Sequence, residues 1–118
     1  MSWRVEYYED ETGHRYAKEE IARVPKKARA KLLRFIDLLE EEGPIDMGGD
    51  YTAHVKDDIW ELRVDFSSDS YRVLYFTVVD RTVVLLREFL KKTQKTPPSE
   101  ISVAKRRRDD YLRMRHTP

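Results

Sequence analysis

The segment Ile59–Phe66 constrains the fold most, because its residues alternate strictly between apolar and polar. A period of two is typical of a β-strand with one buried face. Two further strand-like segments follow, Tyr71–Val79 and Thr82–Leu90, after the short turns Ser67–Ser70 and Asp80–Arg81. Connections this short join antiparallel neighbours, so the sequence predicts a three-stranded β-meander.

The residues before this meander are expected to form one strand, two helices and a loop. Trp3–Tyr8 alternates like a strand, and residues 14–24 have apolar positions at helical spacing. A second helix, with Pro25 in its first turn, carries an amphipathic stripe up to the stop at Gly43-Pro44. Asp46–Asp50 is expected to be a loop.

A last helix is expected from a cap at Ser99 to about Met114. We therefore expect an α+β fold of two layers, in which an antiparallel β-sheet (the three-stranded meander plus the N-terminal strand) packs against two N-terminal helices, with a C-terminal helix. The 118 residues fit a single domain, residues 1–118. The sheet face away from the two helices is expected to stay open in part.

Composition excludes several classes of site. The chain has no cysteine, which rules out disulfides, zinc thiolates and thiol nucleophiles. No apolar run has the length of a signal peptide or a membrane span, so we expect a cytoplasmic protein without a membrane partner. The net charge is only +1, but residues 87–118 contain ten Lys or Arg against four Asp or Glu. This asymmetry suits contact with a polyanion, although a solvated helix face is the alternative.

The histidines do not suggest a metal centre. His14, His54 and His116 are scattered, and none forms an i, i+4 pair on an expected helix, so neither a metal nor a cofactor is predicted. His54 is a candidate for acid–base work, with an exposed edge-strand residue as the alternative. Gly48-Gly49 lacks the Lys and Ser/Thr of a nucleotide-binding loop.

Basic residues on the expected strands are the remaining candidates. Arg63 points away from the apolar face of its strand, and Arg72 interrupts an apolar, aromatic strand, where burial is costly unless the charge is paired or used. The alternative for Arg72 is a structural salt bridge with an acidic neighbour: Glu61, Asp65 or Glu88. Lys91-Lys92 closes the next strand, so the meander should bring these cations to one sheet surface. Such a cluster suits a phosphodiester.

Three motifs resemble one family in order and spacing: Trp60–Arg63 (WELR), Tyr71–Phe76 (YRVLYF) and Leu85–Pro97 (LLREFLKKTQKTP). Together they resemble the core of HigB-type toxins, the phage-derived branch of the RelE/ParE superfamily. The resemblance covers about residues 53–111. It implies the toxin of a type II toxin–antitoxin system, a ribosome-dependent messenger-RNA endoribonuclease that inhibits translation. The implied partners are a cognate helix-turn-helix, HigA-like antitoxin, messenger RNA and the ribosome.

The resemblance also implies site residues. Its motifs place Arg63, Arg72, Lys91 and Lys92 at the catalytic site. Further RNA-binding candidates are Lys95, Arg87 and Lys56. Pro97-Pro98 stands in the region where superfamily members often have a Tyr, His or Glu acid or base, so no residue there is assigned that role. Tyr111 is an additional candidate for it, beside His54, the acid–base candidate named above.

The expected chemistry needs no metal. The ribose 2′-OH attacks the adjacent phosphate, the arginines stabilise the charged oxygens, and Lys91 or Lys92 moves the proton. Two alternatives have the same fold: a ParE-like toxin that binds DNA gyrase, and an inactive binding protein. The presence of all four basic residues favours the nuclease.

Overall fold

The computed structural model describes residues 2–115, so His116 lies outside the described residues. Within residues 2–115, five strands and four helices follow one another in this order: β1 (Arg4–Tyr7), α1 (Tyr16–Ala22), α2 (Lys26–Glu42), α3 (Pro44–Met47), β2 (Thr52–Lys56), β3 (Ile59–Phe66), β4 (Asp69–Val78), β5 (Thr82–Lys91) and α4 (Pro98–Arg115). The α+β class and the C-terminal helix are confirmed.

The strands form one mixed sheet in the order β1-β5-β4-β3-β2. The pairs β3–β4 and β4–β5 are antiparallel, which confirms the meander. The expected sheet of a meander plus one strand is wrong. An additional strand, β2, pairs antiparallel with β3, and β1 joins the other edge parallel to β5, so the sheet is not purely antiparallel.

Helices α1 and α2 cover one face of the sheet. The amphipathic stripe of α2 places Leu32 and Leu39 in the core, where both are fully buried. They belong to one apolar cluster with Val73 and Tyr75 of β4 and Leu85 of β5. The buried stripe and the Gly43 stop explain why α2 ends where the sequence predicts.

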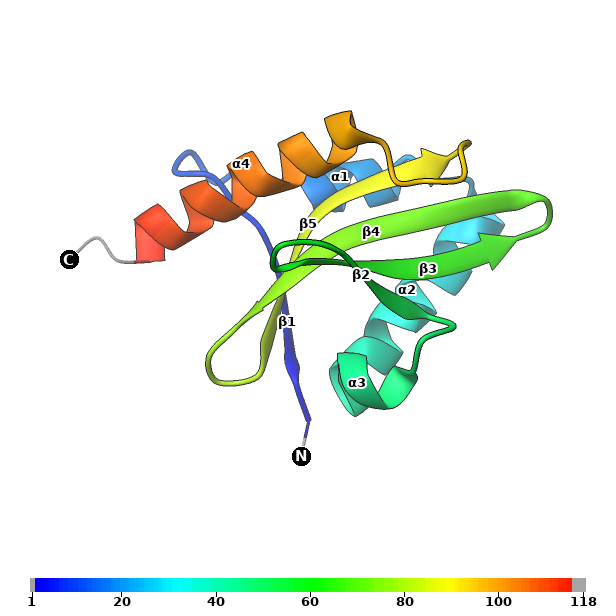
Figure 1. Cartoon of the computed structure of the whole chain (residues 1–118), viewed down its shortest axis with the longest axis horizontal. Helices are drawn as coiled ribbons and strands as arrows, with labels where there is room; N and C mark the ends of the chain where they lie inside the picture. Colours follow the sequence, from blue (N-terminus) through cyan, green and yellow to red (C-terminus); the bar gives the residue numbers. More distant parts are fainter. Residues whose placement is uncertain (1, 116–118) are drawn as a thin grey trace.

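Helix α4 covers part of the opposite face. Its Ala104 is fully buried and belongs to a second apolar cluster with Leu74 and Phe76 of β4. Figure 1 shows α4 crossing the sheet on the side away from α2. The two-layer description is therefore wrong, because the C-terminal helix adds a third layer.

The start of α4 differs from the expected cap. Pro98 is the first helical residue, and the carbonyl of Pro97 accepts hydrogen bonds from the amides of Glu100 and Ile101 at 3.0 and 3.2 Å. Ser99 therefore lies inside the first turn and does not cap the helix. A proline fits this position because its missing amide has no partner to lose there.

The edge of β5 is covered by two elements in turn. Strand β1 pairs only with residues 82–85 of β5. Further along, the Glu20 carboxylate of α1 accepts a hydrogen bond from the Glu88 amide at 3.0 Å, in place of a strand partner. The same carboxylate pairs with Arg87 of β5 and Arg107 of α4, which ties three elements together.

No helix within residues 2–115 has both the length and the apolar character that a membrane span requires.

Candidate active site

The strand register places the candidate cations on the sheet face that carries α4. Residues paired across antiparallel strands project their side chains from the same face. Three successive rows cross β3, β4 and β5 on this face: Glu61–Leu74–Arg87, then Arg63–Arg72–Phe89, then Asp65–Ser70–Lys91. Leu74 packs in the cluster beneath α4, and the other two rows lead away from it toward the end of β5.

A hollow opens at the far end of these rows. It is lined by Ser68, Asp69, Ser70, Arg72, Leu90, Lys91, Lys92, Thr93 and Gln94, and we call it the cationic hollow. Arg72 and Lys91 reach it from adjacent strands, and Lys92 from the loop 92–97 between β5 and α4. The structure thus brings Arg72, Lys91 and Lys92 together, with Arg63 beside Arg72 in the same row.

The two arginines share one buried carboxylate. Oε2 of Glu61 accepts a hydrogen bond from Nε of Arg63 at 2.8 Å and lies 3.6 Å from Nε of Arg72. Nη1 of Arg72 also donates to the Tyr71 carbonyl at 3.0 Å and lies 3.5 Å from Oδ1 of Asp65. Two of the three expected acidic neighbours therefore pair with Arg72. The third, Glu88, is paired with Val73 and faces the side of α1 and α2.

Asp65 stays charged at the rim of this arrangement. The hydroxyl of Ser70 donates to its Oδ1 at 2.8 Å. This hydrogen bond and the nearby Arg72 guanidinium hold the pKa of Asp65 below its usual range. The carboxylates of Glu61, Asp65 and Asp69 offset part of the charge of the four cations, and one positive charge remains in excess.

The lysines keep their charges available. Among residues 2–115, no carboxylate forms an ion pair with Lys91, Lys92 or Lys95. Lys92 and Lys95 are exposed, and Lys91 is half-buried. Positive side chains without an internal partner can bind an external anion without breaking an ion pair.

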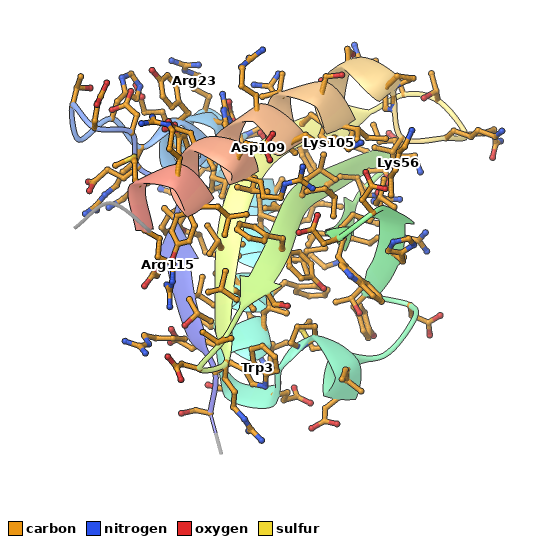
Figure 2. All side chains as sticks on the ribbon, turned by 60° about the vertical axis from the view of Figure 1, so that its left-hand side comes forward. Trp3, Arg23, Lys56, Lys105, Asp109 and Arg115 are labelled. Atoms are coloured by element: carbon orange, nitrogen blue, oxygen red, sulfur yellow. The ribbon has the colours of Figure 1, made fainter. Side chains whose placement is uncertain are left out.

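Arg87 and Lys56 are placed differently from the other basic candidates. Arg87 is one row away from Arg72, but its guanidinium is held by Glu20 and Glu100, both at 2.6 Å. Lys56 pairs with Ile59 at the start of β3, four residues before Arg63. Figure 2 labels it on the same side of the molecule as Lys105 of α4. Neither residue lines the cationic hollow.

His54 and Tyr111 also lie outside the hollow. His54 is paired with Trp60, whose alternation places it on the sheet face away from Arg63, and the two rings meet edge to face at 5.2 Å. The Tyr111 hydroxyl donates to Glu6 at 2.9 Å, and its ring packs on Phe76. Burial and the Glu6 carboxylate raise the pKa of Tyr111. The structure gives both residues packing contacts outside the cationic hollow, and His54 is exposed on the edge strand β2, which is the alternative expected for it.

Glu61 and Thr96 belong to the site although the sequence did not single them out as site residues. Oε1 of Glu61 accepts a hydrogen bond from the Thr96 hydroxyl at 2.8 Å. Glu61 had a signal, since it shares the polar face of its strand with Arg63. Thr96 had none, because only the path of the loop brings it back to β3.

Metal ligands are not assembled in the described part of the chain: residues 2–115 contain no group of three or more His, Asp or Glu side chains that could hold an ion.

The sequence was compared with protein-family models and with curated proteins. The model of the family described as phage-derived protein Gp49-like (DUF891) matches residues 19–109. The chain belongs to this family. Gp49-like proteins are a RelE/HigB-like toxin family, associated with toxin–antitoxin systems. The matched range contains all the rows and the cationic hollow described above. The comparison with curated proteins gives no match.

Proposed function

We propose that this Gp49-like protein is the toxin of a type II toxin–antitoxin system and cleaves messenger RNA on the ribosome in the cytoplasm. The observation that carries the proposal is the grouping of Arg63, Arg72, Lys91 and Lys92 at one end of the sheet. A helix-turn-helix, HigA-like antitoxin is the proposed partner that neutralises it. The family membership supports an antitoxin partner in general.

The proposed reaction is an internal transesterification. The 2′-oxygen of ribose bonds to the adjacent phosphorus, and the bond from phosphorus to the 5′-oxygen of the next nucleotide breaks. The products are a 2′,3′-cyclic phosphate and a 5′-hydroxyl. One proton leaves the 2′-hydroxyl and one reaches the departing 5′-oxygen, so no further reactant is consumed.

The side chains divide this work by their chemistry. The planar guanidinium of Arg63 suits two parallel hydrogen bonds to the phosphate oxygens, and Nη2 of Arg72 suits a further one. Negative charge grows on these oxygens in the transition state. Lys91 and Lys92, with mobile ammonium groups, are the candidates for moving the protons. The ribosome would position the message, and its RNA would complete the active site that these four side chains begin.

A translation extract with primer extension on the message tests the proposal. We expect wild-type protein to cut within codons, and Arg72→Lys and Lys92→Ala to lower the rate by about 100-fold or more, as loss of an aligned stabilising group does. Arg106→Ala is the matched control, because Arg106 is an exposed cation of α4 outside the hollow.

Two results would reject the nuclease. Intact message together with double-strand DNA breaks in cells would identify a gyrase-binding toxin. Intact message without growth arrest would identify an inactive binding protein.

A further inference from the structure

Glu61 is a charged side chain at the centre of the site with almost no access to solvent. It is 2% exposed, although a carboxylate is rarely buried without several partners. Its Oε2 faces the Nε atoms of Arg63 and Arg72, and its Oε1 accepts the hydrogen bond from Thr96. One carboxylate therefore contacts both arginines and the loop that carries the lysines.

Glu61 contacts both arginines from the Nε side, which leaves both terminal nitrogens of Arg63 and one terminal nitrogen of Arg72 open. It contacts the Nε atom of each guanidinium, not the terminal nitrogens. Within residues 2–115, the two terminal nitrogens of Arg63 and Nη2 of Arg72 have no hydrogen-bond partner. A phosphate can bind the pair of terminal N–H groups of Arg63, and it can accept a hydrogen bond from Nη2 of Arg72. The carboxylate thus holds Arg63 by a hydrogen bond and Arg72 by a charge contact at 3.6 Å, and it leaves these terminal nitrogens to a phosphate.

Thr96 extends this arrangement to the lysine loop. The loop 92–97 leaves the end of β5, and Lys92 and Lys95 are both exposed on it. Its Thr96 hydroxyl reaches back across the sheet face to Glu61 on β3. This hydrogen bond ties the loop that carries Lys92 and Lys95 to the carboxylate that contacts both arginines.

We infer that Glu61 is a positioning residue of the proposed nuclease: it aligns Arg63 and Arg72 for a phosphate and, through Thr96, holds the lysine loop at a set distance from them. The inference rests on the proposed function. The negative charge of Glu61 next to the arginines weakens their attraction for RNA. The fixed geometry that Glu61 gives them accelerates the reaction. Glu61 should consequently favour cleavage at some expense of binding.

Glu61→Gln separates these two effects. Binding is measured on ribosomes with a message that has 2′-deoxyribose at the cleavage position, and cleavage in a single turnover with the normal message. We expect binding as tight as wild type or tighter, with a salt dependence steeper by up to about 0.7 in the log–log slope. We expect cleavage to slow by about 100-fold, because a displacement of about 1 Å can have that effect. Equal loss of binding and cleavage would overturn the inference.

Thr96 gives a second test that leaves both charged partners in place. Thr96→Val keeps the shape of the side chain and removes the hydroxyl, whereas Thr96→Ser keeps the hydroxyl. We expect cleavage by the valine variant to slow by about 10-fold, as the loss of one positioning hydrogen bond implies. The serine variant should retain most of the rate. Equal rates in the two variants would contradict the role of Thr96, even if Glu61→Gln fails to fold.

A spectroscopic measurement separates this inference from the proposed function. In nuclear magnetic resonance spectra, the Nε–H proton of Arg63, which donates to Glu61, should exchange slowly with water in the wild type and faster in Glu61→Gln. Slow exchange in a protein that cleaves no RNA would reject the nuclease and leave the alignment by Glu61 standing. Fast exchange in the wild type would reject the alignment, whatever the activity.

Discussion

At Arg72, a side chain that is 11% exposed lies between two carboxylates and still borders the cationic hollow. An unpaired guanidinium at this depth would cost several kcal/mol, on the order of the penalty for any buried ion. Glu61 and Asp65 reduce that penalty. Pairing inside the protein and contact with a phosphate are therefore compatible here, because they use different nitrogens of one group.

Lys92 offers a test of phosphate contact at the residue scale. It is exposed and has no ion-pair partner among residues 2–115, so Lys92→Gln should leave the fold unchanged. If Lys92 binds a phosphate, the slope of log affinity for single-stranded RNA against log salt should become shallower by about 0.7. Lys27→Gln is the control, since Lys27 is an exposed lysine of α2 beyond the other face of the sheet. Equal slope changes in the two variants would contradict a specific contact.

Glu88 should make stability depend on pH. Burial, with a smaller contribution from the nearby Glu20 carboxylate, raises the pKa of Glu88 from its ordinary value of 4.5 to about 7. Between these two values the folded protein keeps a proton that the unfolded chain has released. Stability from this group is thus full below pH 4.5 and is lost as the pH rises through 7.

Thermal unfolding of Glu88→Gln measures this effect. We expect the variant to have a higher melting temperature than wild type at pH 8, and the difference to shrink toward pH 4.5, where both side chains are neutral. Glu41→Gln, at an exposed position of α2, should show no such convergence. A difference between Glu88→Gln and wild type that stays constant with pH would show that folding does not raise the pKa of Glu88.

At the scale of elements, the end of α2 depends on one glycine. Gly43 has φ +86° and ψ 161°, a conformation that is open almost only to glycine. It also lies under the indole of Trp3, and an added Cβ would collide with that ring. Figure 2 shows Trp3 at this end of the molecule, opposite α4. The close approach joins the N-terminal segment to the end of α2.

Gly43→Ala and Gly48→Ala form a matched pair. Gly48 has nearly the same backbone conformation, with φ 88° and ψ 169°, but no atom lies within 4 Å of its added Cβ. We expect Gly48→Ala to lower the free energy of unfolding by about 1–3 kcal/mol through backbone strain alone. Gly43→Ala should lower it by a further 1–3 kcal/mol or so through overpacking. Urea titration measures both, and equal losses would mean that Trp3 moves aside freely.

The elements also show which parts of the fold a single sequence can predict. Strict alternation and short turns fix β3, β4 and β5, because both signals are local. Strand β2 was missing from the expected sheet, although an exposed edge-strand residue was the alternative for His54. The five residues TAHVK are too short to predict a strand without their pairing with β3. The sheet face that α4 covers was also not predicted. Ala104 is the one buried residue of α4, and many charged side chains of this helix form ion pairs with other parts of the fold.

In the candidate site, too, the sequence predicted the contacts within the meander and not those with distant segments. The alternation of β3 and the meander were sufficient to place Arg63, Arg72 and Lys91 on one face. Arg87 was grouped with them on charge, but α1 and α4 supply carboxylates that the strand pattern does not reveal. Prediction therefore succeeded for contacts within the meander and failed for contacts between distant segments.

At the scale of the whole molecule, Glu20 connects elements from both ends of the chain. Its carboxylate, 13% exposed, lies 2.6 Å from Arg87 of β5 and 3.0 Å from Arg107 of α4, and it also accepts the Glu88 amide. The Arg107 guanidinium in addition lies 4.9 Å from the ring centre of Tyr16 on α1. Helix α4 is thus held on the sheet by charges as much as by apolar contact.

Glu20→Gln should consequently destabilise the whole fold. It leaves Arg107 without its carboxylate and Arg87 with only Glu100, and breaking a buried pair on one side costs about 3–5 kcal/mol. Glu19→Gln is the control on the same helix, because Glu19 is 49% exposed and its pairs with His14 and Arg23 lie at the surface. Its substitution should cost less than about 1 kcal/mol. The free energies of unfolding in urea decide the matter: similar losses for the two variants would mean that apolar packing alone holds α4 on the sheet.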